Sequence, residues 1–424
     1  MNATAFPHDW KRFLSLRYVV GKIEQRGVLW YLLKPARKLA RLLVGLIALA
    51  VAYPLSLTRL RFITIASIDR IGHWVCEPDC YIKEGILGMR PQFFGITLIP
   101  RSKTANSHLL EYWRPHFSII TSPLLCSLLG PLSQTKTLKY DVTRYVSAIN
   151  ETAAVFRIQA KYGDRPPLLS LRKEDRERGW DCLRKLGIPD DAWFVCVHCR
   201  EAGYVRDEAH DFRNTEIQSY VPAMKAIVDR GGWCIRLGDP TMKQLPPLEQ
   251  IIDYAHRSAK SDWMDIFLCA SCRFLLGSAS GLGNLATVFG VPVAIANQSP
   301  LSVIFPFGPR DIGISKMVWS RDEKRLLTFQ EILDSPIANF RYASLYEKEG
   351  VSLIDNSPDE IRDLALEMLN RVEGKAVCTA EDEVLQQRFK SMFKPGHYSH
   401  GAISQAGRDF LRKYSYLLGD QQPY

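Results

Sequence analysis

Apolar residues are distributed along the chain in two different ways. A stretch of 17 residues without a charge, LLVGLIALAVAYPLSLT, occupies positions 42–58. Beyond it, short apolar runs rich in β-branched and aromatic residues alternate with longer amphipathic stretches. This alternation is typical of strands and helices in βαβ units, which build parallel sheets. The pattern therefore predicts an α/β fold preceded by a hydrophobic leader.

The first alternating series predicts a lobe over residues 62–170. Strand-like runs lie at 62–68, 93–99 and 117–122, and LLEYW between the last two is helical in character. We expect a loop for IGHWVCEPDCY at 71–81 and a linker for YGDRPPLLS at 162–170, where Pro and Gly gather.

The second series predicts a lobe over residues 171–375 that resembles a nucleotide-binding α/β fold. Its strands and helices alternate, and further helices over 376–424 form a predicted C-terminal extension. The predicted strands are 193–198, 233–238, 273–277 and 291–297, and the predicted helices are 173–186, 216–229, 262–272 and 282–289.

The net charge of +10 is concentrated in the leader. Residues 1–61 contain eleven Lys and Arg against two acidic residues, which leaves the remaining 363 residues nearly neutral. We therefore expect no nucleic-acid partner, and we expect residues 1–61 to meet an anionic membrane surface. The ten cysteines show no disulfide framework, which favours a reducing compartment. The expected location is the cytoplasmic face of the cell membrane, with a monotopic or single short membrane segment near 42–58; a buried helix is the alternative.

The strongest local motif is GSASGLGNLATVFGVP at 277–292. A buried strand runs into a turn of small residues and then a helix, whose N-terminus favours an anion. The spacing matches neither the dinucleotide fingerprint nor the P-loop. The candidate ligand residues in this turn are Ser278, Ser280, Gly281 and Asn284. The alternative is a tight strand–helix turn without a ligand.

A polar loop follows the strand that ends at position 198, where parallel sheets place ligands. The planar guanidinium of Arg200 is suited to a diphosphate, and Asp211 or Glu201 could serve as a base toward a hydroxyl. His198 and Arg213 belong to the same loop region. The alternative is a solvated, salt-bridged loop in which His198 is structural.

The cysteines and histidines give weaker signals. The two C-x-x-C pairs, at 196–199 and 269–272, suggest a zinc site, but the first lies in a strand, where alternation separates the side chains. We therefore expect no metal. Gly72 and His73 could line a ligand site from the N-terminal lobe, although a structural role for this histidine is the alternative.

Several of these segments resemble a family of bacterial proteins described as glycosyltransferases: IGHWVCEP, VCVHCRE with HDFRNTEIQSYVPA, IRLGDP, and SDWMDIFLCASCRFLLGSASGL. More distantly, the HCR segment is similar to the H-x-R loop of fucosyltransferases, and GSASGLGNLATVFGVP to the serine–glycine turn of heptosyltransferases. The resemblance implies a GT-B-like fold, with two Rossmann-like lobes facing a cleft. It also implies a nucleotide-sugar donor on the C-terminal lobe and an acceptor facing the N-terminal lobe.

The resemblance implies roles for particular residues. Arg200 matches the arginine that holds the donor diphosphate, His198 lies beside it, and Ser278, Ser280 and Gly281 match the phosphate-side turn. The expected donor site consists of Arg200, Arg213, Ser278, Ser280, Gly281 and Asn284. The expected catalytic residues are Asp211, Glu201 and His198, and the expected acceptor-side residues are Gly72 and His73.

The sequence thus predicts a metal-independent and inverting glycosyltransferase of polysaccharide biosynthesis. It would transfer a hexosyl or deoxyhexosyl group from a nucleoside diphosphate to a hydroxyl of a glycan or lipid-linked acceptor, without a cofactor. Two alternatives stay open, a catalytically idle membrane-tethered scaffold and a nucleotide-sugar epimerase on the same fold.

Overall fold

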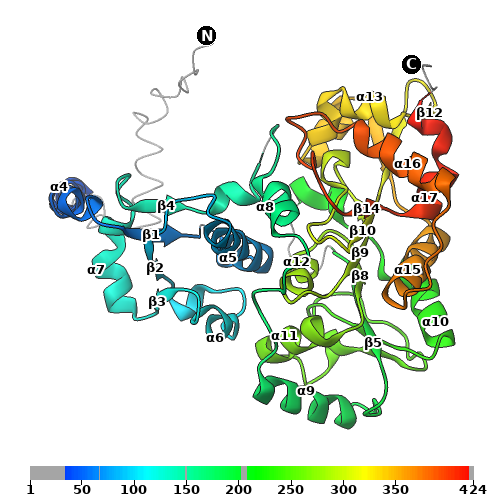
Figure 1. Ribbon diagram of the computed structural model, residues 1–424, viewed down its shortest axis with the longest axis horizontal. Helices are drawn as coiled ribbons and strands as arrows, with labels where there is room; N and C mark the ends of the chain where they lie inside the picture. Colours follow the sequence, from blue (N-terminus) through cyan, green and yellow to red (C-terminus); the bar gives the residue numbers. More distant parts are fainter. Residues whose placement is uncertain (1–33, 66, 149, 202–207, 420–424) are drawn as a thin grey trace, which may run out of the picture.

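The computed structural model describes residues 34–65, 67–148, 150–201 and 208–419. In this part of the chain the strands form two parallel sheets, of four and seven strands, and one antiparallel sheet of three. Figure 1 shows the four-stranded sheet at one end of the molecule and the seven-stranded sheet at the other, with α5 and α8 between them. The predicted α/β class with parallel sheets is confirmed, and the predicted lobe boundaries stay predictions.

The four-stranded sheet has the order β3-β2-β1-β4, with every neighbouring pair parallel. β2 and β3 lie inside the predicted runs, and β1 overlaps its run but begins two residues earlier, at Leu60. β4 lies where no regular element was expected. The strands are β1 (Leu60–Thr64), β2 (Phe94–Leu98), β3 (Ser118–Ile120) and β4 (Lys139–Asp141). The accompanying helices are α4 (Lys34–Ser56), α5 (Ile71–Ile86), α6 (Leu109–Trp113), α7 (Pro123–Ser133) and α8 (Ala154–Tyr162).

The expected loop at 71–81 is wrong, because these residues form most of α5. Pro78 suggested a break, since proline cannot donate the helical hydrogen bond to the carbonyl four residues earlier. In the structure, the Trp113 indole N–H donates to that carbonyl, on Trp74, at 3.2 Å. The helix is retained because Trp74 and its neighbours are buried against the sheet and the lost bond is replaced.

The seven-stranded sheet has the order β14-β10-β9-β8-β5-β6-β7 and is parallel throughout. β5, β8 and β9 are buried along their whole length, as expected for apolar strands covered on both faces. The strands are β5 (Phe194–His198), β6 (Trp233–Arg236), β7 (Ile251–Asp253), β8 (Leu275–Gly277), β9 (Val293–Gln298), β10 (Ile312–Ser315) and β14 (Gln405–Ala406).

Helices pack around this sheet, and the small antiparallel sheet is separate from it. The helices are α9 (Lys173–Lys185), α10 (Val221–Asp229), α11 (Asp262–Ser271), α12 (Gly281–Val288), α13 (Phe329–Leu333), α14 (Ala343–Lys348), α15 (Pro358–Val372), α16 (Ala380–Ser391) and α17 (Arg408–Lys413). The antiparallel strands are β11 (Met317–Ser320), β12 (Arg325–Leu326) and β13 (Val351–Ile354).

Both parallel sheets reverse their strand order at one point. After β5 the chain adds β6 and β7 on one side and then places β8 on the other side of β5. In the same way, β2 and β3 extend from one side of β1 before β4 pairs with its other side. Connections from neighbouring strands diverge at such points and leave room for ligands beyond the carboxyl ends.

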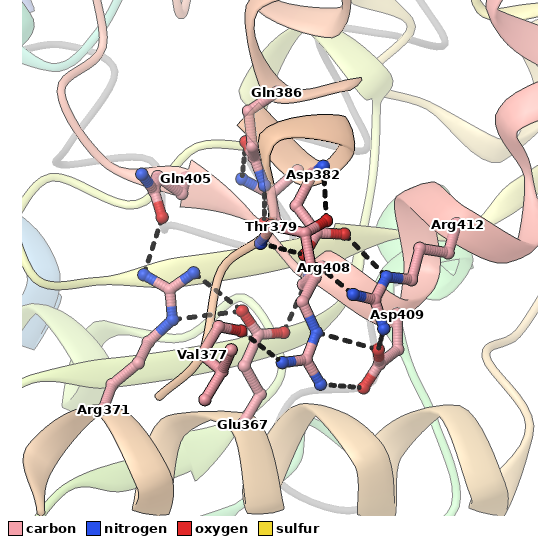
Figure 2. Close-up of polar contacts among 11 residues, drawn as sticks. Glu367, Arg371, Val377, Thr379, Asp382, Gln386, Gln405, Arg408, Asp409 and Arg412 are labelled. Carbon is pink, nitrogen blue, oxygen red and sulfur yellow. Dashed lines mark hydrogen bonds and ion pairs between the residues drawn. The ribbon is translucent and has the colours of Figure 1, made fainter. Parts of the chain in front are cut away.

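The C-terminal segment is attached to the seven-stranded sheet by β14 and by a polar network (Figure 2). Glu367 on α15 accepts hydrogen bonds from the Arg408 amide at 2.7 Å and from the guanidinium of Arg371 at 2.7 Å. Asp382 on α16 accepts two hydrogen bonds from Arg412 on α17, at 2.6 and 2.7 Å. This segment, expected to be helical only, therefore contributes a strand to the sheet as well as helices.

The apolar leader continues as α4, whereas residues 1–33 lie outside the described residues. Only a narrow face of α4 packs on the body, where Ala52 meets Phe62 and Leu138. Large apolar side chains of α4 are exposed at 42, 43, 44, 46, 47, 49, 51 and 53. At 100° per residue these positions cover more than half of the helix circumference. No helix in the described ranges is long and apolar enough to cross a membrane.

Candidate functional site

The candidate site lies where β5 and β8 end side by side. The register pairs His198 with Gly277, so the segments that follow both strands begin at the same level of the sheet. The Ser278 amide donates to the His198 carbonyl at 3.0 Å, and the Arg200 amide donates to Ser278 Oγ at 2.8 Å. A side chain at Gly277 would meet the His198 carbonyl oxygen at 2.2 Å, so this contact requires glycine.

The turn between β8 and α12 points backbone and hydroxyl groups at one region. Ser280 is the N-cap of α12, yet its side chain caps no backbone amide. Its Oγ is buried and has no hydrogen-bond partner in the described part of the chain. The free amides at the start of α12 and the helix dipole make this region favourable for an anion.

Arginine side chains converge on this turn. Arg213 donates to the Ala279 carbonyl at 3.0 Å, and Arg200 Nε donates to Asn214 Oδ1 at 3.2 Å. Burial, together with the nearby charges of Arg200, Arg341 and Arg70, lowers the pKa of Arg213 to about 10. Four guanidinium groups from three separate parts of the chain therefore lie close enough to repel one another.

Three of these four arginines pair with no carboxylate in the described part of the chain. Within the described ranges, no ion pair joins Arg70, Arg213 or Arg341 to an acidic side chain. Arg341 donates to the Ala148 carbonyl at 2.7 Å, while its Nε is buried without a partner. A cluster of like charges at a helix N-terminus is stabilised when an anion binds to it. The arrangement therefore favours the binding of an anion at this turn.

Solved structures that match this chain include glycosyltransferases. A glycosyltransferase of family 9 from Veillonella parvula matches at 14% identity and a TM-score of 0.32, over 56% of this chain and 66% of its own. The ADP-heptose lipopolysaccharide heptosyltransferase II of E. coli matches at 12% identity and a TM-score of 0.34, over 57% of this chain and 86% of its own. The dodecameric iron-containing heptosyltransferase TibC, solved with ADP-D-β-D-heptose, matches at 13% identity and a TM-score of 0.34, over 60% and 62%.

These similarities are distant and partial, and the chain spans slightly less than two thirds of the first of these structures. No family model matches the sequence, and no curated protein matches it.

The structure brings most of the expected donor residues together. Arg200 bonds to Ser278, and Arg213 bonds to the Ala279 carbonyl of the same turn. Ser280 and Gly281 continue this turn into α12, and Asn284 lies one turn further. Gly72 in α5 approaches the start of α12 from the side of the four-stranded sheet. A Cβ atom at Gly72 would lie 3.1 Å from Asn284 Nδ2 and 3.2 Å from Gly281 Cα.

The expected catalytic residues occupy three different environments. His198 is buried, and burial lowers its pKa to about 4, so the ring is neutral at pH 7. Glu201 Oε2 accepts from Arg236 at 2.7 Å. Arg236 is fully buried and also donates to Asp253 at 2.9 Å, so Glu201 belongs to a buried ion-pair network.

Asp211 is the most accessible of the three. It lies in the short helix η3 (Glu208–Arg213) and is exposed to solvent. Its Oδ1 accepts from Asn214 Nδ2 at 2.7 Å, and Asn214 Oδ1 in turn accepts from Arg200. Asp211 is thus connected to the arginine cluster through Asn214.

Sequence reasoning missed Arg70, Arg341, Asn214 and Glu77. Glu77 had a local signal, because it stands four residues after His73 and a helix brings such residues together. The other three had no such local signal. Arg70 and Arg341 come from parts of the chain that are distant from Arg213. No group of His, Cys, Asp and Glu that could hold a metal occurs among the described residues.

Proposed function

We propose that this protein is a glycosyltransferase that takes its sugar from a nucleoside diphosphate. The observation that carries the proposal is the arginine cluster at the N-terminus of α12, next to the orphaned Ser280 hydroxyl. When the bond between sugar and diphosphate breaks, negative charge accumulates on the departing diphosphate. Preorganised guanidinium groups and helix amides stabilise that charge without a metal ion.

The acceptor approaches from the N-terminal sheet. Gly72 and the start of α5 lie against the start of α12, so the two ligand-bearing ends of the parallel sheets meet at the same place. Figure 1 shows α5 and α12 next to each other between the two sheets. We propose that a hydroxyl of a glycan or lipid-linked acceptor is held on the α5 side, and that the transferred group is hexosyl or deoxyhexosyl with inversion.

We also propose that the leader places this acceptor site at the cytoplasmic face of the cell membrane. The exposed apolar surface of α4 is continuous with α7, where Leu124 and Leu128 are also exposed and where Leu129 and Leu132 pack into the same cluster as Ala52. Basic residues precede this surface in the sequence at 34, 37, 38 and 41 and follow it at 59 and 61. Apolar side chains flanked by cations suit an anionic lipid surface.

The experiment is a thermal-unfolding panel of the full chain with ADP, UDP, GDP, CDP and the matching nucleoside monophosphates. We expect one diphosphate to raise the unfolding temperature more than its monophosphate, because the cluster accommodates a second phosphate. Arg213→Gln should lose this effect. Arg321→Gln is the control, because Arg321 also donates to backbone carbonyls but lies in the turn after β11, away from α12.

Turnover of nucleotide sugars that carry the selected base separates the alternatives. An epimerase would bind the diphosphate and convert the nucleotide sugar without releasing its sugar. An idle scaffold would show neither release nor conversion with any nucleotide sugar. Stabilisation by no diphosphate at all would contradict the proposed function.

A further inference from the structure

A sugar transfer needs a group that accepts the proton of the attacking hydroxyl, and two of the three residues expected from the sequence are unsuited to it. His198 is buried, with Nδ1 3.4 Å from the Leu237 carbonyl. Glu201 is held by the buried Arg236, and removing it from that ion pair would leave a buried charge. Asp211 is exposed on the donor side and bonded to Asn214, so water surrounds it and nothing fixes it toward an acceptor.

A histidine–glutamate pair lies on the acceptor side instead. His73 Nδ1 is 2.6 Å from Glu77 Oε1, one turn along α5. The His73 side chain is 26% exposed, whereas Glu77 is fully buried and its Oε2 has no partner among the described residues. When Glu77 is ionised it only accepts hydrogen bonds, and a neutral imidazole beside it carries its proton on Nδ1. Nε2, which bonds to no described residue, is then the free acceptor nitrogen of a partly exposed ring.

The pair is located at the junction of the two sheets. His73 directly follows Gly72, which contacts Gly281 at the first residue of α12. A side chain at Gly281 would lie 2.5 Å from the Gly72 amide nitrogen, so the two helix starts touch through their backbones. His73 is therefore next in sequence to the residue that contacts the turn assigned to the diphosphate.

We propose that His73 is the general base of the transfer and that Glu77 positions it; the inference rests on the proposed function. The acceptor oxygen forms a bond to the anomeric carbon while the bond from that carbon to the diphosphate oxygen breaks. The hydroxyl proton moves to His73 Nε2, and the electron pair of the broken bond leaves with the diphosphate beside Arg213. Atoms and charge balance without a metal or redox partner.

The burial of Glu77 gives the pair its function. A carboxylate withdrawn from water interacts strongly with an imidazolium ion that forms next to it. Its hydrogen bond also fixes the tautomer and the orientation of the ring, as the carboxylate does in a serine-protease triad. Glu77 is therefore a positioning residue, and His73 is the residue that touches the substrate.

The test measures nucleoside diphosphate released from nucleotide sugars that carry the base selected by the binding panel. Water and n-octyl β-D-glucoside supply the acceptor hydroxyls. A positioned base contributes about 10²–10⁴-fold to the rate. We expect His73→Ala to lower kcat at least about 100-fold with little change in donor KM, and added imidazole to restore part of the rate. Glu77→Gln should lower kcat about 10-fold and leave donor KM unchanged.

The control is His108→Ala. His108 pairs with Asp175 at 2.8 Å, with exposures of 23% and 8% that match those of the proposed pair, but it lies outside the α5–α12 junction. Thermal unfolding and nucleoside diphosphate binding are measured for every variant, so that a folding defect is recognised.

Three outcomes overturn the proposal. No release by the wild-type chain with any nucleotide sugar would overturn the transferase and the base together. Unchanged release by His73→Ala would overturn only the base. Loss of release in Asp211→Asn with normal release in His73→Ala would assign the proton to Asp211.

Discussion

The contact between α5 and α12 should be sensitive to one methyl group. A Cβ added at Gly281 would lie 2.5 Å from the Gly72 nitrogen and 2.5 Å from Ile71 Cγ2. Non-bonded heavy atoms prefer about 3.5–4.0 Å, so Gly281→Ala must separate the two helix starts by about 1 Å. The obstacle is partly backbone, which cannot rotate away as a side chain can.

Overpacking of this kind costs about 1–3 kcal/mol. Taking about 2 kcal/mol, the unfolding temperature should fall by about 4–8 °C for a domain of this size. Nucleoside diphosphate binding should weaken as well, because the displaced residue begins the helix that faces the ligand. The assays are thermal unfolding and calorimetric titration of the full chain.

Gly283→Ala, two residues along the same helix, is the matched control. Its Cβ would meet only the Ile295 Cδ1 atom, at 3.3 Å, which belongs to the end of a flexible side chain. Alanine also favours a helix over glycine by about 1 kcal/mol. We therefore expect Gly283→Ala to be neutral or slightly stabilising. Equal stability and equal binding in the two variants would refute the close contact.

Three other predictions concern stability and location. The pKa of His198 is lowered from 6.5 to about 4. Its stabilising contribution is therefore complete above pH 6.5 and is lost as the pH falls toward 4, by about 3 kcal/mol. His198→Gln should flatten this part of a plot of unfolding free energy against pH, and an unchanged slope would contradict the assignment. Arg236→Met removes the ion-pair partner of Glu201 and one of the three partners of Asp253. It should destabilise the fold by about 3–5 kcal/mol in chemical denaturation, whereas a loss below 1 kcal/mol would show that the network is dispensable. Leu124→Glu with Leu128→Glu on α7 should reduce flotation with phosphatidylglycerol vesicles. Val377→Glu with Val384→Glu, at exposed positions of the other lobe, should not. Equal flotation of both double variants would argue against a membrane-facing α7.

The strands were predictable because their signals are local. Runs such as WFVCVH and RFLLG are apolar, β-branched or aromatic, and bounded by polar or glycine-containing segments. The structure places β5 and β8 inside these two runs. α5 was mistaken for a loop because Pro78 breaks the local pattern, and the compensating indole of Trp113 lies 35 residues away in the chain. β14 and β13 are short strands whose pairing partners, β10 and β11, are distant in sequence.

The candidate site was predictable only as far as topology determines it. Carboxyl ends of adjacent parallel strands share one edge, which brings Arg200 and Ser278 into contact from segments 78 residues apart. The ion pair of Glu201 with Arg236 was not predictable, because Arg236 lies inside a buried strand where a charge is unexpected. The proximity of Arg70 and Arg341 to Arg213 depends on how the two sheets pack together, which no local pattern encodes.

The most direct test of the central claim is a calorimetric titration of the full chain with the nucleoside diphosphate chosen by the unfolding panel. Hydrogen bonds to charged groups contribute about 1.5–3 kcal/mol, so Arg213→Gln should weaken binding about 10- to 100-fold, while Arg321→Gln should bind as the wild type does. Equal affinity of Arg213→Gln and the wild-type chain would contradict a diphosphate site at the start of α12.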